Sequence, residues 1–470
     1  MIFRDWLKEL DYTLLQGSVD VETEDVIYDS RKAAPGKVFV AMKGIRVDGH
    51  SFIPQVLKAG VRVLVTERPV EEELKNSGLS EEELKQVTVV MVEEGRHALA
   101  LLSAARFDHP AKKLVMIGVT GTKGKTTTTH MIRAILLAAG KKVGMIGTTG
   151  TVIGDVVTPT LNTTPESYEL HQAFAQMVEA GCEYAVMEVS SQGIKMHRTD
   201  GLYFNYAIFT NISPDHIGPG EHADFEEYLY YKTRLLNMCG IGLVNKDDKH
   251  APQIIKAANC ELYTYSEESK EADFVASDIR YVSQPDFVGT EFHISGKYDM
   301  EVRLGIPGLF NVVNALAAVS VCSFLGLDQA RISHALENIR VNGRMEIVYT
   351  SERCTVLVDY AHNAVSMESL LSTLRDYKPK RLVCVFGCGG NRSKDRRYSM
   401  GEIGGKMADL SIITADNSRY EKVEDIIADI RGSIEKTGGK FIEIPDRREA
   451  IRYSILHAQP GDMVAVIGKG

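Results

Sequence analysis

Short apolar runs alternate with amphipathic segments along most of the chain. The run KLVMIGVTG at 113–121 is continuously apolar and ends in glycine, which is typical of a strand buried on both faces of a parallel sheet. A helix is predicted at 125–140, and strands and helices continue to alternate as far as residue 245. This alternation predicts a doubly wound α/β domain around a central, mostly parallel sheet.

Two further blocks flank this region. The first block combines short apolar runs with helical segments, and it includes a charged stretch at 71–86 that we expect to be solvated and helical. The last block repeats the strand–helix alternation on a smaller scale, with helices predicted at 366–377, 396–408, 423–436 and 447–458. We therefore predict three α/β domains: an N-terminal domain at 1–108, a central domain at 109–340 and a smaller, Rossmann-like C-terminal domain at 341–470.

Composition narrows the class of protein. The 470 residues carry a net charge of -9, so the chain is not a general nucleic-acid or membrane binder. No apolar run approaches the roughly 18–20 residues that cross a bilayer, and residues 1–12 predict a short amphipathic helix, not a secretory signal. The seven cysteines show no CxxC pair, and Cys384 and Cys388 are interpreted as ordinary thiols near a strand end. We expect a cytoplasmic monomer without nucleic-acid or membrane partners.

The segment VTGTKGKTTTTHMI at 119–132 places a glycine-rich turn between a strand and a helix that begins Lys-Thr. Backbone N–H groups at such a helix start point at phosphate oxygens, Lys125 can reach the terminal phosphates, and the Thr126 hydroxyl is placed for Mg²⁺. The strict phosphate-loop pattern has glycine at the position of Val119, whereas this chain has Gly118 and Gly121. An empty glycine-rich turn is the alternative, but the strand–loop–helix context favours nucleotide binding. The predicted phosphate-binding residues are Gly121, Thr122, Lys123, Gly124, Lys125, Thr126 and Thr127.

Three side chains after the phosphate loop add to this chemistry. Glu188 ends an apolar strand, His216 lies in the turn after the next strand, and Lys232 lies on the following helix. Taken singly, each has an ordinary structural explanation. Together, on successive elements of one nucleotide-binding sheet, they predict a metal-assisted phosphoryl-transfer site.

An ordered set of motifs then points to a family. The motifs are GTKGKTTT, TTPE, EVSS, TNISPDH, YYKTRLL, FNVVNALAA, GR at 343–344, DYAH at 359–362, FGCGG and DNSR. Their order and spacing resemble the Mur ligases of peptidoglycan synthesis, in particular those that add the third residue of the stem peptide. The resemblance extends over essentially the whole chain. It implies a first domain for the UDP end of the substrate, a second for ATP and a third for the incoming amino acid.

The resemblance also implies a reaction and the residues that support it. ATP would convert a substrate carboxylate into an acyl phosphate, which the amine of the incoming amino acid then attacks. By family position Lys125 and Thr126 hold ATP and one Mg²⁺, Glu188 bridges metal ions, and His216 ligates the second ion. Lys232 matches a lysine that becomes carbamylated, which requires a neutral amine and therefore a depressed pKa. Three further residues are implied to reach the nucleotide, the last two after domain closure: Asn311, Arg344 and Asp359.

For the UDP-N-acetylmuramoyl-dipeptide, the resemblance implies contacts at both ends. Ser30 and Arg31 match the uridine-end segment at 28–53, in which Gly44, Asp48 and His50 are expected to shape the loop. Toward the muramoyl-peptide, the implied residues are Thr163, Thr164, Ser190 and Arg198. For Ser190, a strand-end turn hydroxyl remains an equally weighted alternative.

The implied amino-acid site comprises Asp416, Asn417, Arg419 and Gly468. A guanidinium at Arg419 can clamp the distal carboxylate of meso-diaminopimelate, which L-lysine lacks, so diaminopimelate is favoured. Ser418 replaces the proline that is usual between Asn and Arg in the diaminopimelate-adding members.

Other departures keep alternatives open. Gln192 and Met196 stand where the family usually has His and Gln, and the last strand ends at Gly470 where the family continues with His-Glu. A shortened chain and a divergent paralogue both explain that ending. An L-lysine-adding ligase, a folylpolyglutamate-type ligase and a non-catalytic paralogue that binds ATP or the UDP-muramoyl-peptide are the competing functions.

Overall fold

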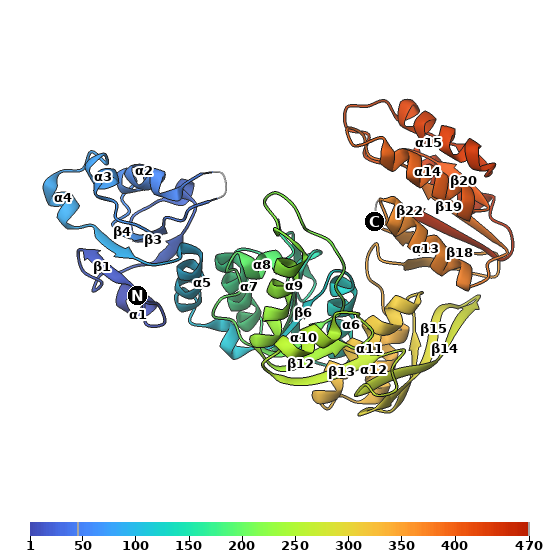
Figure 1. Cartoon of the computed structure of the whole chain (residues 1–470), viewed down its shortest axis with the longest axis horizontal. Helices are drawn as coiled ribbons and strands as arrows, with labels where there is room; N and C mark the ends of the chain where they lie inside the picture. Colours follow the sequence, from blue (N-terminus) through green and yellow to red (C-terminus); the bar gives the residue numbers. More distant parts are fainter. Residues whose placement is uncertain (45–46, 469–470) are drawn as a thin grey trace. The chain divides into compact units, whose positions relative to one another are not determined.

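The computed structural model describes residues 1–44 and 47–468. Its strands form three sheets, of five, eleven and six strands, in chain order (Figure 1). The described chain is organised in two compact units, 1–129 with 140–264 and 130–139 with 265–470. The three sheets confirm the predicted three-domain α/β architecture, and the first compact unit contains both the first sheet and most of the central one.

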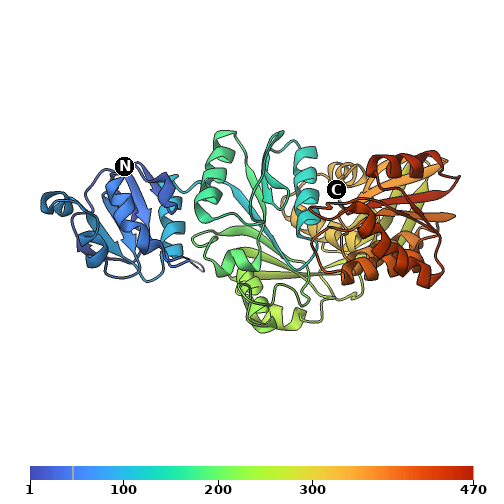
Figure 2. The same cartoon turned by 90° about the horizontal axis from the view of Figure 1, so that it is seen from above.

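The N-terminal sheet has the strand order β1-β5-β4-β3-β2, and all its neighbours are parallel except β1 with β5. Its strands are β1 (Thr13–Gln16), β2 (Asp25–Ile27), β3 (Lys37–Val40), β4 (Val63–Thr66) and β5 (Thr88–Met91). The helices around it are α1 (Phe3–Trp6), η1 (Ser30–Lys32), η2 (Gly49–Phe52), α2 (Ile53–Lys58), α3 (Glu71–Lys75), α4 (Glu81–Lys85) and α5 (Gly95–Arg106). Figure 2 shows the same strands from above, as one twisted layer (blue).

Side-chain alternation explains why helices cover both faces of this sheet. Val38 and Val63 point to one face, where they pack against Leu99 of α5. Phe39 and Leu64, one position further along the same strands, point to the opposite face and pack with α2. Because successive strand residues face opposite sides, four consecutive apolar residues require a cover on each side.

The central sheet has the order β16-β15-β14-β13-β12-β11-β6-β10-β7-β8-β9. Its first strands are β6 (Val115–Thr120), β7 (Val143–Gly147), β8 (Gly150–Ile153), β9 (Val156–Thr158), β10 (Tyr184–Glu188), β11 (Phe204–Phe209) and β12 (Cys239–Asn245). The others are β13 (Glu261–Ser266), β14 (Phe274–Gln284), β15 (Phe287–Gly296) and β16 (Met300–Leu304). The strands β7, β10, β6, β11 and β12 are parallel, which places the ends of β6, β10 and β11 at one edge.

Helices complete this region. They are η3 (Pro110–Lys113), α6 (Lys125–Ala138), α7 (Ser167–Glu179), α8 (Ser191–Lys195), α9 (Phe225–Thr233), η4 (Arg234–Asn237), α10 (Ala251–Ala257), α11 (Leu309–Phe324) and α12 (Gln329–Glu337). Phe174 of α7 and Tyr228 of α9 pack with Met187 of β10 in one buried cluster. That cluster fixes α9, and with it Lys232, against the sheet.

The C-terminal sheet has the order β17-β18-β22-β19-β20-β21, parallel except for β17 with β18. Its strands are β17 (Glu346–Thr350), β18 (Cys354–Asp359), β19 (Arg381–Phe386), β20 (Leu410–Ile413), β21 (Phe441–Glu443) and β22 (Asp462–Ile467). Its helices are α13 (Ala364–Asp376), α14 (Asp395–Met407), α15 (Val423–Thr437) and α16 (Arg447–Leu456). Helices α14 and α15 pack side by side (Figure 1), and Ala450 of α16 belongs to the core with the inner strands.

Most predicted helices lie within two residues of their observed bounds. The charged stretch at 71–86 forms two short helices, α3 and α4, and Cys384 and Cys388 are both buried and free. Helix α1 is shorter than the predicted helix at 1–12 and covers only Phe3–Trp6. Across 1–44 and 47–468, no helix has the length and apolarity that a membrane crossing requires.

Candidate active site

The phosphate loop joins β6 to α6 and is braced by the chain that follows β11. Gly121 and Gly124 have φ values of 144° and 86°, a region that favours glycine. A Cβ on Gly121 would lie 1.9 Å from Oγ1 of Thr210, so no larger residue fits there without rearrangement. The N–H groups of Thr122 and Lys123 donate to the main-chain and side-chain oxygens of Asn211, each at 2.9 Å. The loop is therefore held in shape by the protein itself.

Two lysines converge on one carbonyl of this loop. Nζ of Lys125 and Nζ of Lys232 each donate to the Gly121 carbonyl oxygen at 2.8 Å. The Lys232 side chain is 1% exposed, and its Nζ lies 4.6 Å from the centre of the Tyr228 ring. Burial first, and the nearby Lys125 cation second, lower the pKa of Lys232 well below its usual value. Lys232 is thus an amine with a strong tendency to be neutral.

Glu188 gathers oxygen and nitrogen donors at the end of β10. Oγ1 of Thr126 lies 3.0 and 3.1 Å from its two carboxylate oxygens, and Thr148 donates through its N–H at 2.9 Å and its hydroxyl at 3.2 Å. Gly147 leaves the necessary room, since a Cβ there would lie 2.3 Å from Oε1 of Glu188. A carboxylate and two threonine hydroxyls form a hard oxygen set of the kind that Mg²⁺ prefers. The residues present therefore fit a magnesium ion.

His216 is placed differently from the other predicted metal ligand residues. Its side chain is 57% exposed, its φ is 53°, and Nδ1 lies 3.1 Å from Oε1 of Glu221. Its ring centre is 6.2 Å from that of Tyr228. Lys125, Thr126, Glu188 and Lys232 thus lie within the braced core of the site, whereas His216 lies on an exposed loop beside it.

Tyr228 and His222 belong to the same region, and sequence reasoning missed them. The Tyr228 hydroxyl lies 3.1 Å from Oγ1 of Thr122, and burial raises the Tyr228 pKa to about 12. Nε2 of His222 lies 2.9 Å from Oγ of Ser191, and burial followed by the Lys195 cation lowers the His222 pKa. The i,i+4 spacing of Tyr228 and Lys232 on one helix was the available signal for the tyrosine; His222 had none.

The residues predicted to face the muramoyl-peptide form a turn network beneath Glu188. Thr164 is fully buried; its hydroxyl donates to the Glu188 carbonyl at 3.0 Å and accepts from the Ser190 N–H at 3.0 Å. Oγ of Ser190 accepts from the Gly193 N–H at 3.0 Å and caps α8, as expected for a strand-end turn hydroxyl. Arg198 donates to the Thr164 carbonyl at 3.0 Å. Thr163 lies one residue earlier, its hydroxyl 3.1 Å from that of Thr148.

The predicted uridine-end segment is ordered by local polar contacts. Arg31 has an 85% exposed side chain that pairs with Asp29 at 2.7 Å, and hydrogen bonding from Arg31 lowers the pKa of Asp29 to about 2. Ser30 begins η1. His50 is buried, with Nδ1 2.6 Å from Oδ1 of Asp48. Gly44 is described, whereas positions 45–46 of this segment lie outside the described residues.

The remaining nucleotide-site predictions lie in the second compact unit. Asn311 is buried at the start of α11 and donates from Nδ2 to the Pro307 carbonyl at 2.7 Å. Asp359 ends β18 and accepts from the Met345 N–H at 2.8 Å; burial raises the pKa of this carboxyl group. The Arg344 guanidinium lies 5.9 Å from the centre of the Tyr360 ring.

The predicted amino-acid site also lies in the second unit. Arg419 is exposed, with a φ of 51°, and the Asn417 carbonyl accepts from the Gly390 N–H at 2.8 Å. Oδ2 of Asp416 lies 3.0 Å from where a Cβ on Gly468 would be, so only glycine leaves open space beside this carboxylate. Asp416 in the loop after β20 thus lies close to Gly468 after β22, although β19 separates the two strands in the sheet.

Arg447 supports this site and was missed in the sequence. Its guanidinium donates to the Ile467 carbonyl at 3.0 Å and to the Ala415 carbonyl at 3.4 Å. These two hydrogen bonds link the end of β22 to the loop that follows β20. Burial lowers its pKa, and the Asp416 carboxylate opposes that shift. Its position after IPD at the start of a helix gave no signal of this role.

Comparison with known proteins identifies related domains along the chain. Residues 23–107 match the Mur ligase family catalytic domain, 119–322 the Mur ligase middle domain, and 343–470 the Mur ligase glutamate ligase domain. The solved structure of a UDP-N-acetylmuramoyl-L-alanyl-D-glutamate–2,6-diaminopimelate ligase superimposes with a TM-score of 0.74 and 29% identity, over 95% of this chain and 90% of that one. A folylpolyglutamate synthase from Thermotoga maritima shares the fold at a TM-score of 0.62 and 18% identity, over 80% of this chain and 90% of that one.

Curated relatives are similar along their whole length. The UDP-N-acetylmuramoyl-L-alanyl-D-glutamate–2,6-diaminopimelate ligase of Caldanaerobacter subterraneus subsp. tengcongensis is 39% identical over 99% of this chain and 93% of its own. The Clostridium perfringens protein of the same name is 37% identical over 100% of this chain and 94% of its own. With three matching domains and this full-length identity, the chain belongs to the Mur ligase family, the ATP-dependent ligases of peptidoglycan precursor synthesis.

Proposed function

We propose that this chain joins meso-diaminopimelate to UDP-N-acetylmuramoyl-L-alanyl-D-glutamate at the expense of ATP. The observation that carries the proposal is the pair of lysines on one phosphate-loop carbonyl, with Lys232 buried and its pKa lowered. A loop that only binds nucleotide has no need of a second, buried amine. The names of the full-length relatives support the choice of substrates.

In this proposal the phosphate loop binds ATP through residues 121–127. The N–H groups at the start of α6 face the phosphates, and Lys125 turns from the Gly121 carbonyl toward phosphate oxygens. Thr126 and Glu188 would hold Mg²⁺, with His216 at a second ion. Bound magnesium supplies charge neutralisation between the two anionic reactants.

We further propose that Lys232 is carbamylated. The neutral amine attacks CO₂, a C–N bond forms, and one proton is released to solvent, which converts a neutral buried amine into an anion. This direction of charge suits a site that must hold cations beside triphosphate. The unmodified Lys232 lies against the Gly121 carbonyl and the Tyr228 ring, both of which also accommodate a cation.

The chemistry then needs two transfers. A carboxylate oxygen of the substrate attacks the γ-phosphorus and ADP leaves, which forms an acyl phosphate. The amine of the incoming amino acid attacks the acyl carbon, the tetrahedral adduct loses a proton and phosphate, and an amide remains. The residues of this chain contribute binding and orientation: the braced loop holds the triphosphate in line, and Arg198 and Thr164 position the turn beneath Glu188.

Arg419 is the proposed selector of the amine. A guanidinium and a carboxylate can form two parallel hydrogen bonds, and the ε-carboxylate of meso-diaminopimelate offers that partner where L-lysine offers none. Asp416 and Asn417, in the loop after β20, would bind the amino-acid head together with Gly468, which lies beside Asp416. Asn311, Arg344 and Asp359 would complete the nucleotide site.

Phosphate release from ATP and Mg²⁺ with the UDP-muramoyl-dipeptide tests the proposal. It is run with meso-diaminopimelate, with L-lysine and without amine, and the product mass is determined in each. We expect phosphate and product only with diaminopimelate. Product with L-lysine would overturn the Arg419 assignment, and no product with either amine would favour the non-catalytic paralogue.

The domain bounds 1–108, 109–340 and 341–470, the monomeric state and the cytoplasmic location stay predictions. Limited proteolysis, size-exclusion chromatography with light scattering and cell fractionation respectively check them.

A further inference from the structure

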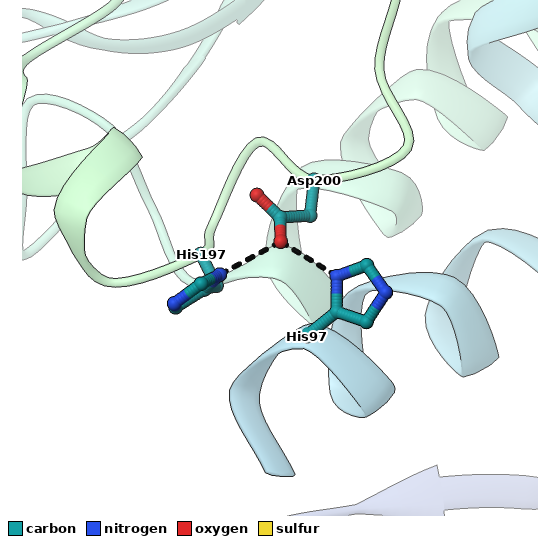
Figure 3. A group of neighbouring side chains, drawn as sticks. All are labelled: His97, His197 and Asp200. Carbon is teal, nitrogen blue, oxygen red and sulfur yellow. Dashed lines mark hydrogen bonds and ion pairs between the residues drawn. The ribbon is translucent and has the colours of Figure 1, made fainter. Parts of the chain in front are cut away.

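Two histidines and an aspartate meet outside the candidate active site. Nδ1 of His97 lies 2.7 Å and Nδ1 of His197 lies 2.8 Å from the same oxygen, Oδ2 of Asp200 (Figure 3). His97 comes from α5 of the N-terminal domain, and the other two come from the turn after α8 in the central domain. We propose that these three side chains form a binding site for Zn²⁺ or a chemically similar divalent transition metal, which clasps the N-terminal domain to the central domain.

The donor set is the first argument for a metal. Two imidazole nitrogens and one carboxylate oxygen, with all three atoms within 4.8 Å of one another, form a set suited to Zn²⁺, Co²⁺ or Ni²⁺ and poorly suited to Mg²⁺. The planes of the two rings meet at 79°, edge to face, and both Nδ1 atoms point toward Oδ2 of Asp200. His97 and His197 can therefore bind one ion without a clash between the rings.

The two Nδ1–Oδ2 distances are those of hydrogen bonds, with a proton on the Nδ1 atom of each imidazole. Tetrahedral zinc, with bonds of about 2.0–2.1 Å, separates its ligand atoms by about 3.3 Å, so each Nδ1–Oδ2 distance must grow by roughly 0.6 Å. The side chains of His97, His197 and Asp200 are 44%, 39% and 23% exposed, which allows that movement and leaves a coordination position open to water. A metal ion would replace the two Nδ1 protons.

Hydrogen bonds within the cluster set the protonation states of its three side chains in the absence of a metal ion. Burial would raise the pKa of Asp200, but hydrogen bonds from His197 and His97 outweigh it and lower that pKa, so a carboxylate is present at neutral pH. The hydrogen bond to Asp200 raises the pKa of His197, with Glu94 adding to the shift and burial and Arg96 opposing it. Metal affinity should therefore fall as pH decreases and the imidazoles take up protons.

The cluster lies beside a second contact between α5 and the central domain. Arg96, next to His97, pairs with Glu166 at 3.5 Å, and Arg198, next to His197, pairs with the same Glu166 at 2.6 Å. The metal cluster and the Glu166 bridge are thus two adjacent links between α5 and the central domain. Because Arg198 is a proposed substrate residue, an ion at this position would fix the junction from which the UDP-substrate is bound.

Cobalt titration of the metal-free, untagged full chain tests the proposal. Co²⁺ reports imidazole ligation through its visible ligand-field absorption, and excess Mg²⁺ keeps hard oxygen sites occupied. We expect one Co²⁺ per chain, displaced by Zn²⁺, and a Zn²⁺-dependent rise in the melting temperature followed by fluorescence of Trp6, the only tryptophan.

The variants separate a metal site from a hydrogen-bonded contact. His97→Asn keeps a donor for Asp200 but is a poor transition-metal ligand, and Asp200→Asn keeps an acceptor but loses the charge. Each should weaken Co²⁺ binding by at least the roughly 10- to 100-fold typical of metal-site partners. Glu188→Gln, in the proposed magnesium site, and His334→Ala, an exposed histidine on α12, should leave cobalt binding unchanged.

Two results would overturn the proposal. One is the absence of ligand-field absorption in the unaltered chain, which would leave the cluster as a contact held by hydrogen bonds alone. The other is equal Co²⁺ affinity in the unaltered chain, His97→Asn and Asp200→Asn, which would place the cobalt elsewhere. Neither readout depends on ligase activity, so failure of the proposed function would not be mistaken for failure of this site.

Discussion

The phosphate loop and the loop at 416–419 both follow buried strands, yet they hold their charged side chains in opposite ways. Lys125 and Lys232 are bonded to the Gly121 carbonyl, and Lys232 is 1% exposed. Arg419 is exposed on a residue with a positive φ. The comparison shows that the lysine pair of the phosphate loop is held inside the fold, whereas the arginine proposed to select the amine is exposed to solvent.

The physical reason lies in what each group must do. A buried amine with a lowered pKa has a chemical reactivity that water would abolish, so Lys232 needs its burial before any ligand arrives. A guanidinium that recognises a carboxylate gains its specificity only when the ligand replaces water. Arg419 therefore does not need to be buried before a ligand binds. We make four predictions, of which the first two test this contrast directly.

The largest effect is expected at Lys232. Lys232→Ala removes both the buried amine and any carbamate, and we expect ligation to fall by on the order of 10²–10³-fold or more. Added bicarbonate should raise the activity of the unaltered enzyme in preparations that lack the carbamate, but not that of the variant. Product mass and phosphate release measure both. Lys141→Ala, at a partly exposed lysine paired with Glu183, is the matched control. Normal turnover by Lys232→Ala would remove the carbamate assignment.

A selective effect is expected at Arg419. Arg419→Ala should raise the KM for meso-diaminopimelate by about 10- to 100-fold, since a charge-assisted hydrogen-bonded pair contributes about 1.5–3 kcal/mol. The KM for ATP should change little. Arg448→Ala removes an exposed arginine from the same domain and serves as the control. Equal changes in both KM values would mean that the substitution disturbs the domain and not the clamp.

The core of the first unit contains an acid-sensitive group. His171 is buried, neither ring nitrogen has a hydrogen-bond partner among the described residues, and burial lowers its pKa to about 3. His171 binds a proton near pH 6.5 in the unfolded chain but not in the folded chain. Above about pH 6.5 this residue therefore causes no loss of folding stability. Folding stability decreases below that pH, by up to about 1.4 kcal/mol per pH unit.

Urea unfolding followed by Trp6 fluorescence measures this loss in the first unit, where Trp6 lies. His171→Phe should reduce the slope between pH 6 and pH 4.5 and keep the stability at pH 7.5, since the ring makes no hydrogen bond that phenylalanine would lose. An unchanged slope in the variant would assign the acid sensitivity to other groups.

The smallest effect is expected at Met196, which directly follows α8 and lies two residues before Arg198. Methionine cannot donate a hydrogen bond, whereas the glutamine usual in the family can. Met196→Gln should lower the KM for the UDP-muramoyl-dipeptide by about two- to tenfold, in line with one hydrogen bond of about 0.5–1.5 kcal/mol. Met196→Leu is the size-matched control. An unchanged KM in the glutamine variant would show that the substrate does not contact this position, and a higher KM would show that glutamine obstructs it.

Local patterns predicted the phosphate loop well because strand, glycine turn and helix start are consecutive in the chain. They could not reveal that Lys232 shares the Gly121 carbonyl with Lys125, since Lys232 and Gly121 are 111 positions apart in the sequence. Thr148 and Thr210 were missed for the same reason: a threonine at a strand end has no signature until its neighbour is known. Ser190 shows a different limit. The sequence left a substrate contact and a turn hydroxyl as equal alternatives for this residue, and the observed hydrogen bond of its hydroxyl caps α8.

By itself, the sequence determined the three α/β domains, the phosphate loop and the family, because apolar alternation and motif order are properties of neighbouring residues. The tertiary structure decided which polar groups meet: the lysine pair on Gly121, the oxygen set around Glu188, the link made by Arg447, and the convergence of His97 on Asp200 across 103 positions. Burial and charge proximity set the pKa values and the ligand sets, and both exist only after segments far apart in the chain have packed together.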